Sequence, residues 1–216
     1  MDWLPFFAQL MTASPAPLLP AAGWMHVSQP LAWALLSGCG ASWLLHRRAR
    51  WERLAGTGLA MAWALWPGSV SSSYWLGLAF QAPSLTTMLL CVWALSPGGR
   101  APGIQGGSNG LGIWRWAGVV LGWMLLLDTL AWLPGWQLYA LGFSPIATLL
   151  VAIGALLAGA AGHFGPKMEV WRVMSVLWLP LAVFVGTRLP SGNLWDALLD
   201  PWLWLWLQGD IVSHVC

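Results

Sequence analysis

Long apolar runs separated by short polar segments dominate the pattern of the chain. Several of these runs approach or exceed the roughly 20 residues that an α-helix needs to cross a hydrocarbon core of about 30 Å. The pattern therefore predicts an all-α fold, a polytopic transmembrane helical bundle with about six spans. The expected spans cover residues 28–45, 54–70, 74–96, 113–134, 138–163 and 171–188.

The segments outside these spans predict a single integral membrane domain over residues 1–216. Residues 1–27 hold several prolines and neither Lys nor Arg, so we expect an outer-surface N-terminal segment and no cleavable signal peptide. Residues 28–188 would form the six-span bundle. Residues 193–216 are expected as an outer interfacial segment, because aspartates near the centre of a span cost about 2.5–3.5 kcal/mol each.

Composition strengthens the membrane prediction. The chain has 216 residues, of which 58% are hydrophobic and 7% charged, whereas a soluble domain carries roughly 25% charged residues. The 20 tryptophans gather near the expected helix ends, where an indole ring suits the membrane–water interface. These features predict the lipid bilayer and other membrane subunits as partners, and no nucleic acid.

Charge orients the predicted bundle, because cations favour the cytoplasmic side of a membrane. With six spans, nearly all cations fall on one side, and Arg188 alone falls opposite. The cations on the common side are Arg47, Arg48, Arg50, Arg53, Arg100, Arg115, Lys167 and Arg172. Both termini are then expected on the outer, periplasmic side of a multi-pass protein. Frequent Ala, Gly, Trp and Arg suit a GC-rich genome and favour a bacterial inner membrane.

Two similar phrases predict repeated two-helix hairpins. YWLGLAFQAPSLTTMLL (74–90) and LYALGFSPIATLL (138–150) each follow a Pro-Gly pair and share Tyr, Leu-Gly, Phe and Pro-x-x-Thr positions. Both copies would run in the same direction, although coincidence in a chain rich in Leu, Ala and Gly is the alternative. A degenerate third copy is indicated because Pro190 and Pro201 have the separation of Pro134 and Pro145.

The repeated prolines predict kinks inside two returning helices. Pro83 and Pro145 each free a backbone carbonyl in the preceding turn, and a nearby hydroxyl or a packed helix has to satisfy it. Such paired breaks either let the bundle pack or form a binding site between broken helices. The sequence favours the packing interpretation.

Asp128 is the one acidic residue well inside a predicted span. A carboxylate in that position is a functional hypothesis, either as a structural hydrogen-bonding group or as an ion or proton carrier. The expected partners are Thr129 locally and Gln81, Ser144 or Tyr139 across helices. Together they form the candidate transport site.

No catalytic constellation is present in the sequence, which lacks HExxH, GxSxG, CxxC and P-loop patterns. The cysteines are expected as small apolar side chains. His46 and His163 both fall at the inner boundary, and two facing histidines can ligate haem; solvated interfacial histidines are the usual case. We therefore expect neither a metal nor a cofactor.

The sequence favours a non-catalytic integral membrane protein that serves as a scaffold, assembly factor or accessory subunit of a larger membrane complex. Few internal polar residues and many packing glycines motivate this prediction. The first alternative is a small ion or solute transporter or channel that uses Asp128. A weaker alternative is a haem-bearing membrane electron carrier.

Overall fold

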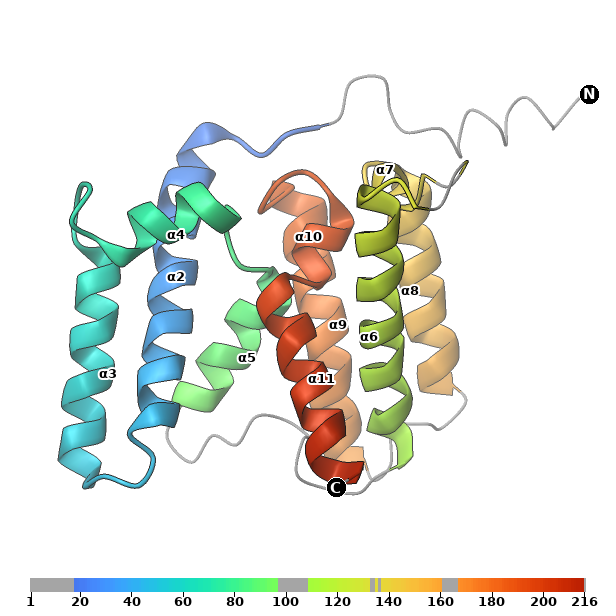
Figure 1. Cartoon of the computed structure of the whole chain (residues 1–216). Helices are drawn as coiled ribbons and strands as arrows, with labels where there is room; N and C mark the ends of the chain where they lie inside the picture. Colours follow the sequence, from blue (N-terminus) through green and yellow to red (C-terminus); the bar gives the residue numbers. More distant parts are fainter. Residues whose placement is uncertain (1–17, 97–108, 133–134, 136, 161–166, 216) are drawn as a thin grey trace, which may run out of the picture.

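The computed structural model describes residues 18–96, 109–132, 135, 137–160 and 167–215, and all regular secondary structure within them is helical (Figure 1). Side chains are described except at 109–114, 158–160, 167–174 and 213–215. The helices are α2 (Ala22–Leu44), α3 (Arg50–Leu65), α4 (Ser72–Phe80), α5 (Leu85–Leu95), α6 (Asn109–Thr129), α7 (Leu138–Leu141), α8 (Pro145–Ala160), α9 (Lys167–Thr187), α10 (Leu194–Leu198) and α11 (Pro201–Val215).

Three helical hairpins of the same plan follow α2. In each, a long helix leads to a turn, a short helix and a returning helix: α3–α4–α5, α6–α7–α8 and α9–α10–α11. Figure 1 shows the three short helices at the same end of the molecule. Each turn contains one glycine with positive φ, at 84° for Gly68, 83° for Gly135 and 86° for Gly192. Glycine adopts this conformation without the steric cost of a side chain, so each turn places a glycine where a larger residue would be strained.

The first two hairpins break where the sequence predicted kinked but continuous helices. α4 ends at Phe80, and α5 begins after Ser84, whose Oγ accepts a hydrogen bond from the Thr87 N–H at 3.1 Å. Pro145 is the first residue of α8, and the preceding Ser144 Oγ accepts from the Ile146 N–H at 3.2 Å. A proline at the first helical position loses no hydrogen bond there. The predicted kinks at Pro83 and Pro145 are therefore wrong: Pro145 begins α8, and Pro83 lies before the N-cap Ser84 of α5.

The prediction of a polytopic transmembrane bundle is wrong. Among the described residues, no helix combines the length with the apolar character that crossing a membrane requires. The expected span 74–96 is divided between a 9-residue and an 11-residue helix, and 138–163 between a 4-residue and a 16-residue helix. Helix α3, in place of the span 54–70, has 16 residues, or about 24 Å at 1.5 Å per residue.

The longer helices α2, α6 and α9 have 23, 21 and 21 residues, but polar residues interrupt their apolar runs. Gln29 lies within α2, and Arg115 and Asp128 lie within α6. The multi-pass localisation in a bacterial inner membrane, with both termini outside, and the transporter interpretation depended on the six spans. They are corrected together with the fold class.

The C-terminal hairpin lies between the other two, in contrast to the interfacial segment expected over 193–216. Helices α9, α10 and α11 occupy the middle of the molecule, with α3 and α8 toward opposite sides (Figure 1). Leu194 and Ala197 of α10 and Phe184 of α9 are each 0% exposed, and they pack with Ala147 of α8 in one core cluster. Helix α10 is therefore an internal element.

Candidate functional site

A group of polar side chains surrounds the start of α10, and we call Tyr139, Ser191, Asn193 and Asp196 the α10 cluster. Asn193 is 0% exposed. Its Oδ1 accepts a hydrogen bond from the Trp195 N–H at 2.9 Å, and its Nδ2 donates to the Tyr139 carbonyl at 2.9 Å. One side chain thus caps its own helix and holds the α7 segment of the second hairpin.

Gly142 explains part of the repeated Leu-Gly phrase. A Cβ atom at this position would overlap Asn193 Oδ1, so only glycine lets the two segments approach. The Gly142 carbonyl accepts a hydrogen bond from the Leu194 N–H at 3.0 Å. The second and third hairpins consequently meet backbone to backbone at this point.

Asp196 is the carboxylate of the α10 cluster. It accepts hydrogen bonds from Ser191 Oγ and, at 3.0 Å, from the Tyr139 hydroxyl. Burial raises the pKa of the Asp196 carboxyl, against the opposing effect of its two hydrogen bonds. The pKa of Tyr139 is also raised, first by burial and then by the charge and hydrogen bond of Asp196. A neutral hydroxyl therefore faces a carboxyl group that gains a proton more readily than an exposed aspartate.

Asp128 and Tyr139, which the sequence placed in one candidate site, do lie together. Asp128 Oδ2 accepts a hydrogen bond from the Tyr139 backbone N–H at 2.8 Å. The contact leaves the Tyr139 hydroxyl free to reach Asp196. The Thr129 hydroxyl donates to the Leu126 carbonyl at 2.9 Å and so stays within α6. Asp128 thus fixes the start of α7 relative to α6.

Asp200 is the functional group that the sequence interpretation missed. It is 7% exposed, and its two oxygens accept from the Ser84 N–H at 2.6 Å and the Leu203 N–H at 2.7 Å. One carboxylate therefore serves the N-termini of both α5 and α11, where negative charge is favoured. The adjacent Pro201 supplied a local signal, since an Asp-Pro pair is typical of a helix start.

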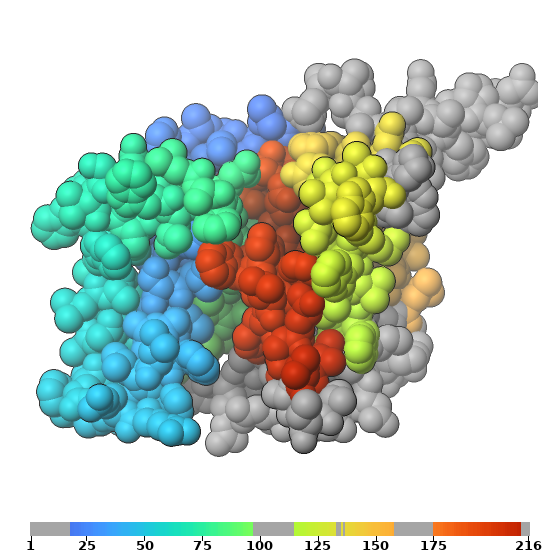
Figure 2. Space-filling model, in the orientation of Figure 1, coloured from blue at the N-terminus to red at the C-terminus, as the bar shows by residue number. Residues whose placement is uncertain are grey.

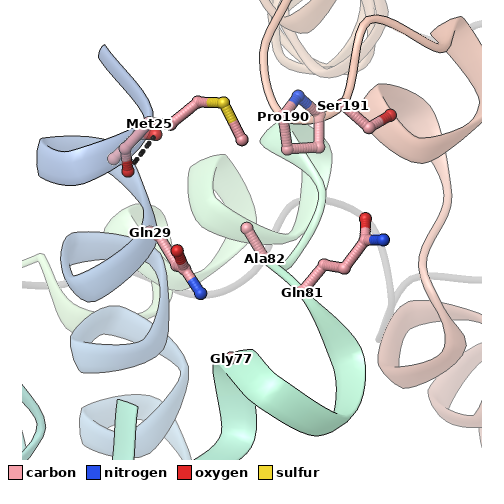
Figure 3. Close-up of a pocket in the computed structure, with 8 residues that line it drawn as sticks. Met25, Gln29, Gly77, Gln81, Ala82, Pro190 and Ser191 are labelled. Carbon is pink, nitrogen blue, oxygen red and sulfur yellow. Dashed lines mark hydrogen bonds between the residues drawn. The ribbon is translucent and has the colours of Figure 1, made fainter. Parts of the chain in front are cut away.

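A pocket of about 380 Å³ opens beside the first turns of α2 and the C-terminal end of α4 (Figure 3). Its lining comes from three segments that are distant in the sequence: α2, the end of α4 with the residues that follow, and the turn before α10. The lining residues are Met25, Ser28, Gln29, Gly77, Gln81, Ala82, Pro190 and Ser191. Ser191 thus belongs to both the pocket and the α10 cluster.

Gln81 adopts an unusual backbone conformation in the pocket wall. Its φ of 59° with a ψ of −120° lies in a region that favours glycine. The Gln81 carbonyl accepts a hydrogen bond from Trp33 Nε1 at 2.8 Å, and the Gln81 N–H donates to the Gly77 carbonyl at 3.0 Å. Trp33 is 1% exposed, so buried structure holds the strained residue in place.

The remaining predicted site residues are distributed over the molecule. Ser144 lies at the start of α8. Gln81 lines the pocket that Ser191 also lines, and no hydrogen bond joins Gln81 to Asp128 or Tyr139 among the described residues. His46 Nδ1 is 2.7 Å from the Trp43 carbonyl, whereas His163 lies outside the described residues. The haem pair therefore stays a prediction. In the described ranges, no three His, Cys, Asp or Glu side chains are placed to hold a metal ion.

The sequence treated the cysteines separately, but α2 and α5 bring two of them together. The neighbouring Cys91 thiol lowers the pKa of Cys39 to about 7, against the opposing effect of burial. The Cys39 thiol raises the pKa of Cys91, to which burial also contributes. Cys91 is buried and Cys39 partly exposed.

Comparisons with known proteins found no family model, curated protein or solved structure that matches this chain. Functional inference consequently rests on the arrangement of its own residues. In that arrangement, Asp128, Asp196 and Asp200 each accept hydrogen bonds that join helices. These contacts fix the positions of the helices relative to one another.

Proposed function

We propose that the protein is a non-catalytic scaffold or accessory subunit, whose edge helices bind apolar helices of other subunits. The observation that carries the proposal is the outer face of α8. This helix bears no ionisable residue over 145–160, and its two faces have different surroundings. Ala147 and Ala155, two helical turns apart, are buried on the side that contacts α9.

The opposite side of α8 is apolar and exposed. We call it the α8 face, and it consists of Leu149, Leu150, Ile153, Leu156 and Leu157. The spacing of these residues matches one stripe of an α-helix. Leu156 is 59% exposed and Leu157 is 65% exposed. A contiguous apolar stripe of this kind is typical of an interaction surface.

Helix α3, at the opposite edge of the molecule, also bears exposed apolar side chains. The α3 face consists of Trp51, Leu54, Leu59 and Trp63 of α3 together with Trp66, the residue that follows the helix, all exposed. Helices α3 and α8 lie at opposite sides of the bundle (Figure 1). The space-filling view shows α3 at one edge, with α2, α4, α6 and α11 also on the viewed face (Figure 2). Two unpartnered apolar edges suit a subunit that bridges two partners.

The internal polar groups also support a structural role. Asp128 of the second hairpin and Asp196 and Asp200 of the third form hydrogen bonds within the chain, and satisfied internal polar groups of this kind favour one arrangement of hairpins over others. A rigid bundle with apolar edges can fix the spacing of its neighbours. This is the task of a scaffold.

The test is isolation of the full-length tagged chain under mild extraction, followed by mass spectrometry and a size measurement. A double substitution, Leu156→Gln with Leu157→Gln, should remove a stoichiometric partner, because it places polar groups in the apolar contact. Val92→Gln, at a 46% exposed apolar position of α5, is the matched control and should retain the partner. Circular dichroism verifies that both variants keep their helices.

A full-length chain that is a stable monomer, with no protein partner and only detergent or lipid on its edges, would overturn the proposal. Equal loss of the partner in the Val92→Gln control would also contradict it, since the α8 face would then have no special role.

A further inference from the structure

The pocket beside α10 carries an inference that the scaffold role does not require. It joins α2, the α4–α5 connection and the turn before α10, so three separate segments form its wall. Its volume of about 380 Å³ falls in the range of small-molecule sites. Figure 3 shows Gln29 and Gln81 on facing sides, with Ser191 at the third side.

The backbone around the pocket is arranged to present Gln81. A non-glycine residue at this φ and ψ costs free energy, and such residues cluster at binding sites. Trp33 Nε1 and the Gly77 carbonyl bind the two backbone polar groups of Gln81. In Figure 3 the carboxamide of Gln81 extends away from Gln29, on the side of the pocket where Ser191 lies.

The position of Gln29 depends on Gly77. A Cβ atom on Gly77 would overlap Gln29 Nε2, so the glycine provides the space that the second carboxamide occupies. Both helices thereby contribute one amide to the same pocket. A larger residue at position 77 would displace one of them.

The polar groups of the lining are uncharged hydrogen-bond donors and acceptors. None of its eight residues is ionisable, and a carboxamide both donates and accepts hydrogen bonds. The Ser191 hydroxyl donates to Asp196, and its oxygen accepts from the Asn193 N–H at 3.2 Å, so a ligand finds one remaining acceptor site there. The Ser28 hydroxyl is directed to the Met25 carbonyl at 3.5 Å and likewise offers an oxygen acceptor.

We propose that this pocket binds a small neutral ligand that carries a carboxamide, such as a primary amide or a peptide group. The ligand N–H groups donate to the serine oxygens and to the glutamine carbonyls, and the glutamine NH₂ groups donate to the ligand oxygen. A carboxylate ligand is disfavoured because the pocket lining holds no cation and desolvating an unpaired charge is costly.

The test measures binding of N-acetylglycinamide to the full-length chain by saturation-transfer NMR and titration calorimetry. The wild-type chain should bind it saturably and should bind N-acetylglycine, its carboxylate counterpart, at least ten-fold more weakly. Gly77→Ala should reduce affinity for the amide at least ten-fold. Gly58→Ala is the matched control, because its new Cβ meets nothing within 4 Å, and it should bind as the wild type does.

Gln29→Leu provides a second variant that removes one carboxamide without adding bulk at position 77. It should also weaken binding at least ten-fold, and it decides the outcome if Gly77→Ala does not fold. Absence of saturable amide binding, equal binding of the carboxylate, or wild-type affinity in a folded pocket variant would overturn the proposal. The α8 face lies outside the pocket, so this failure would leave the scaffold test unaffected.

Discussion

Two carboxylates of the C-terminal hairpin, four residues apart, join it to the other two hairpins in different ways. Asp200 binds backbone N–H groups, those of Ser84 and Leu203. Asp196 binds two hydroxyl groups, those of Ser191 and Tyr139. The first therefore attaches to main chain and the second to side chains.

The two kinds of partner give the two aspartates different roles: Asp200 fixes the fold, whereas Asp196 responds to its surroundings. Backbone N–H groups at helix starts have no other partner within their helix, so Asp200 fixes where α5 and α11 begin. A hydroxyl can rotate and can accept as well as donate, so the surroundings of Asp196 can change with protonation. We therefore expect substitutions around Asp200 to lower stability most and substitutions around Asp196 to alter pH dependence.

Asp200→Ala should have the largest effect, a loss of about 3 kcal/mol in the free energy of unfolding, because two buried N–H groups lose their acceptor. Chemical denaturation followed by circular dichroism measures it. Asp200→Asn retains one side-chain oxygen acceptor and should fall between wild type and Asp200→Ala. Equal stability of the alanine variant and the wild type would show that Asp200 does not hold the two helix starts.

Asn193→Ala should follow, with a loss of about 2 kcal/mol, because it removes one helix cap and one buried interhelical hydrogen bond. The same denaturation experiment measures it. Asn193→Asp keeps an acceptor for the Trp195 N–H but removes the donor to the Tyr139 carbonyl. Its stability should fall below that of Asn193→Ala, because a buried carboxyl oxygen then faces the Tyr139 carbonyl and the carboxyl group has no cationic partner. Wild-type stability in Asn193→Asp would show that the hydrogen bond from Nδ2 does not hold the α7 segment.

Tyr139→Phe should cost about 1 kcal/mol, the net value of one hydrogen bond. Asp196 keeps Ser191 as a partner, so the carboxyl group is not left alone. The variant also tests the comparison directly, because a loss as large as that of Asp200→Ala would show that the hydroxyl partners matter as much as the backbone ones.

Asp196→Asn should have the smallest effect on stability in acid and a clear effect on its pH dependence. Burial raises the folded-state pKa of Asp196 above its ordinary value of 3.8, so the folded chain binds a proton that the unfolded chain has released. The contribution of this group is then complete below pH 3.8 and is lost as pH rises through the folded-state pKa. Unfolding titrations at successive pH values should show a shallower decline for the variant, and an unchanged decline would exclude Asp196 as its source.

Part of the fold was predictable from local pattern. The long apolar runs indicated helices, and the Pro-Gly pairs marked turns whose glycines adopt positive φ at Gly68 and Gly135. The break at Ser84 and the start at Ser144–Pro145 were also written in the sequence as helix-start signals. Hydropathy alone joins the residues on either side of each break into one apolar run, so it predicts a continuous span where the structure has two helices.

The candidate site was less accessible to prediction. The structure brings Asp128 and Tyr139 together through one hydrogen bond between residues that are eleven positions apart in the sequence. The pairing of Asp200 with Ser84 spans 116 residues, and no local pattern encodes it. The same holds for the pocket, whose segments meet only after the hairpins pack.

The sequence by itself determined which segments are helical and where turns and caps interrupt them, because these depend on backbone hydrogen bonds and side chains a few residues apart. Only the tertiary structure decided that the C-terminal hairpin lies at the centre, that Gly142 admits Asn193, and that Asp200 serves two helices. Those outcomes depend on which surfaces pack together, and packing joins residues that the chain keeps far apart.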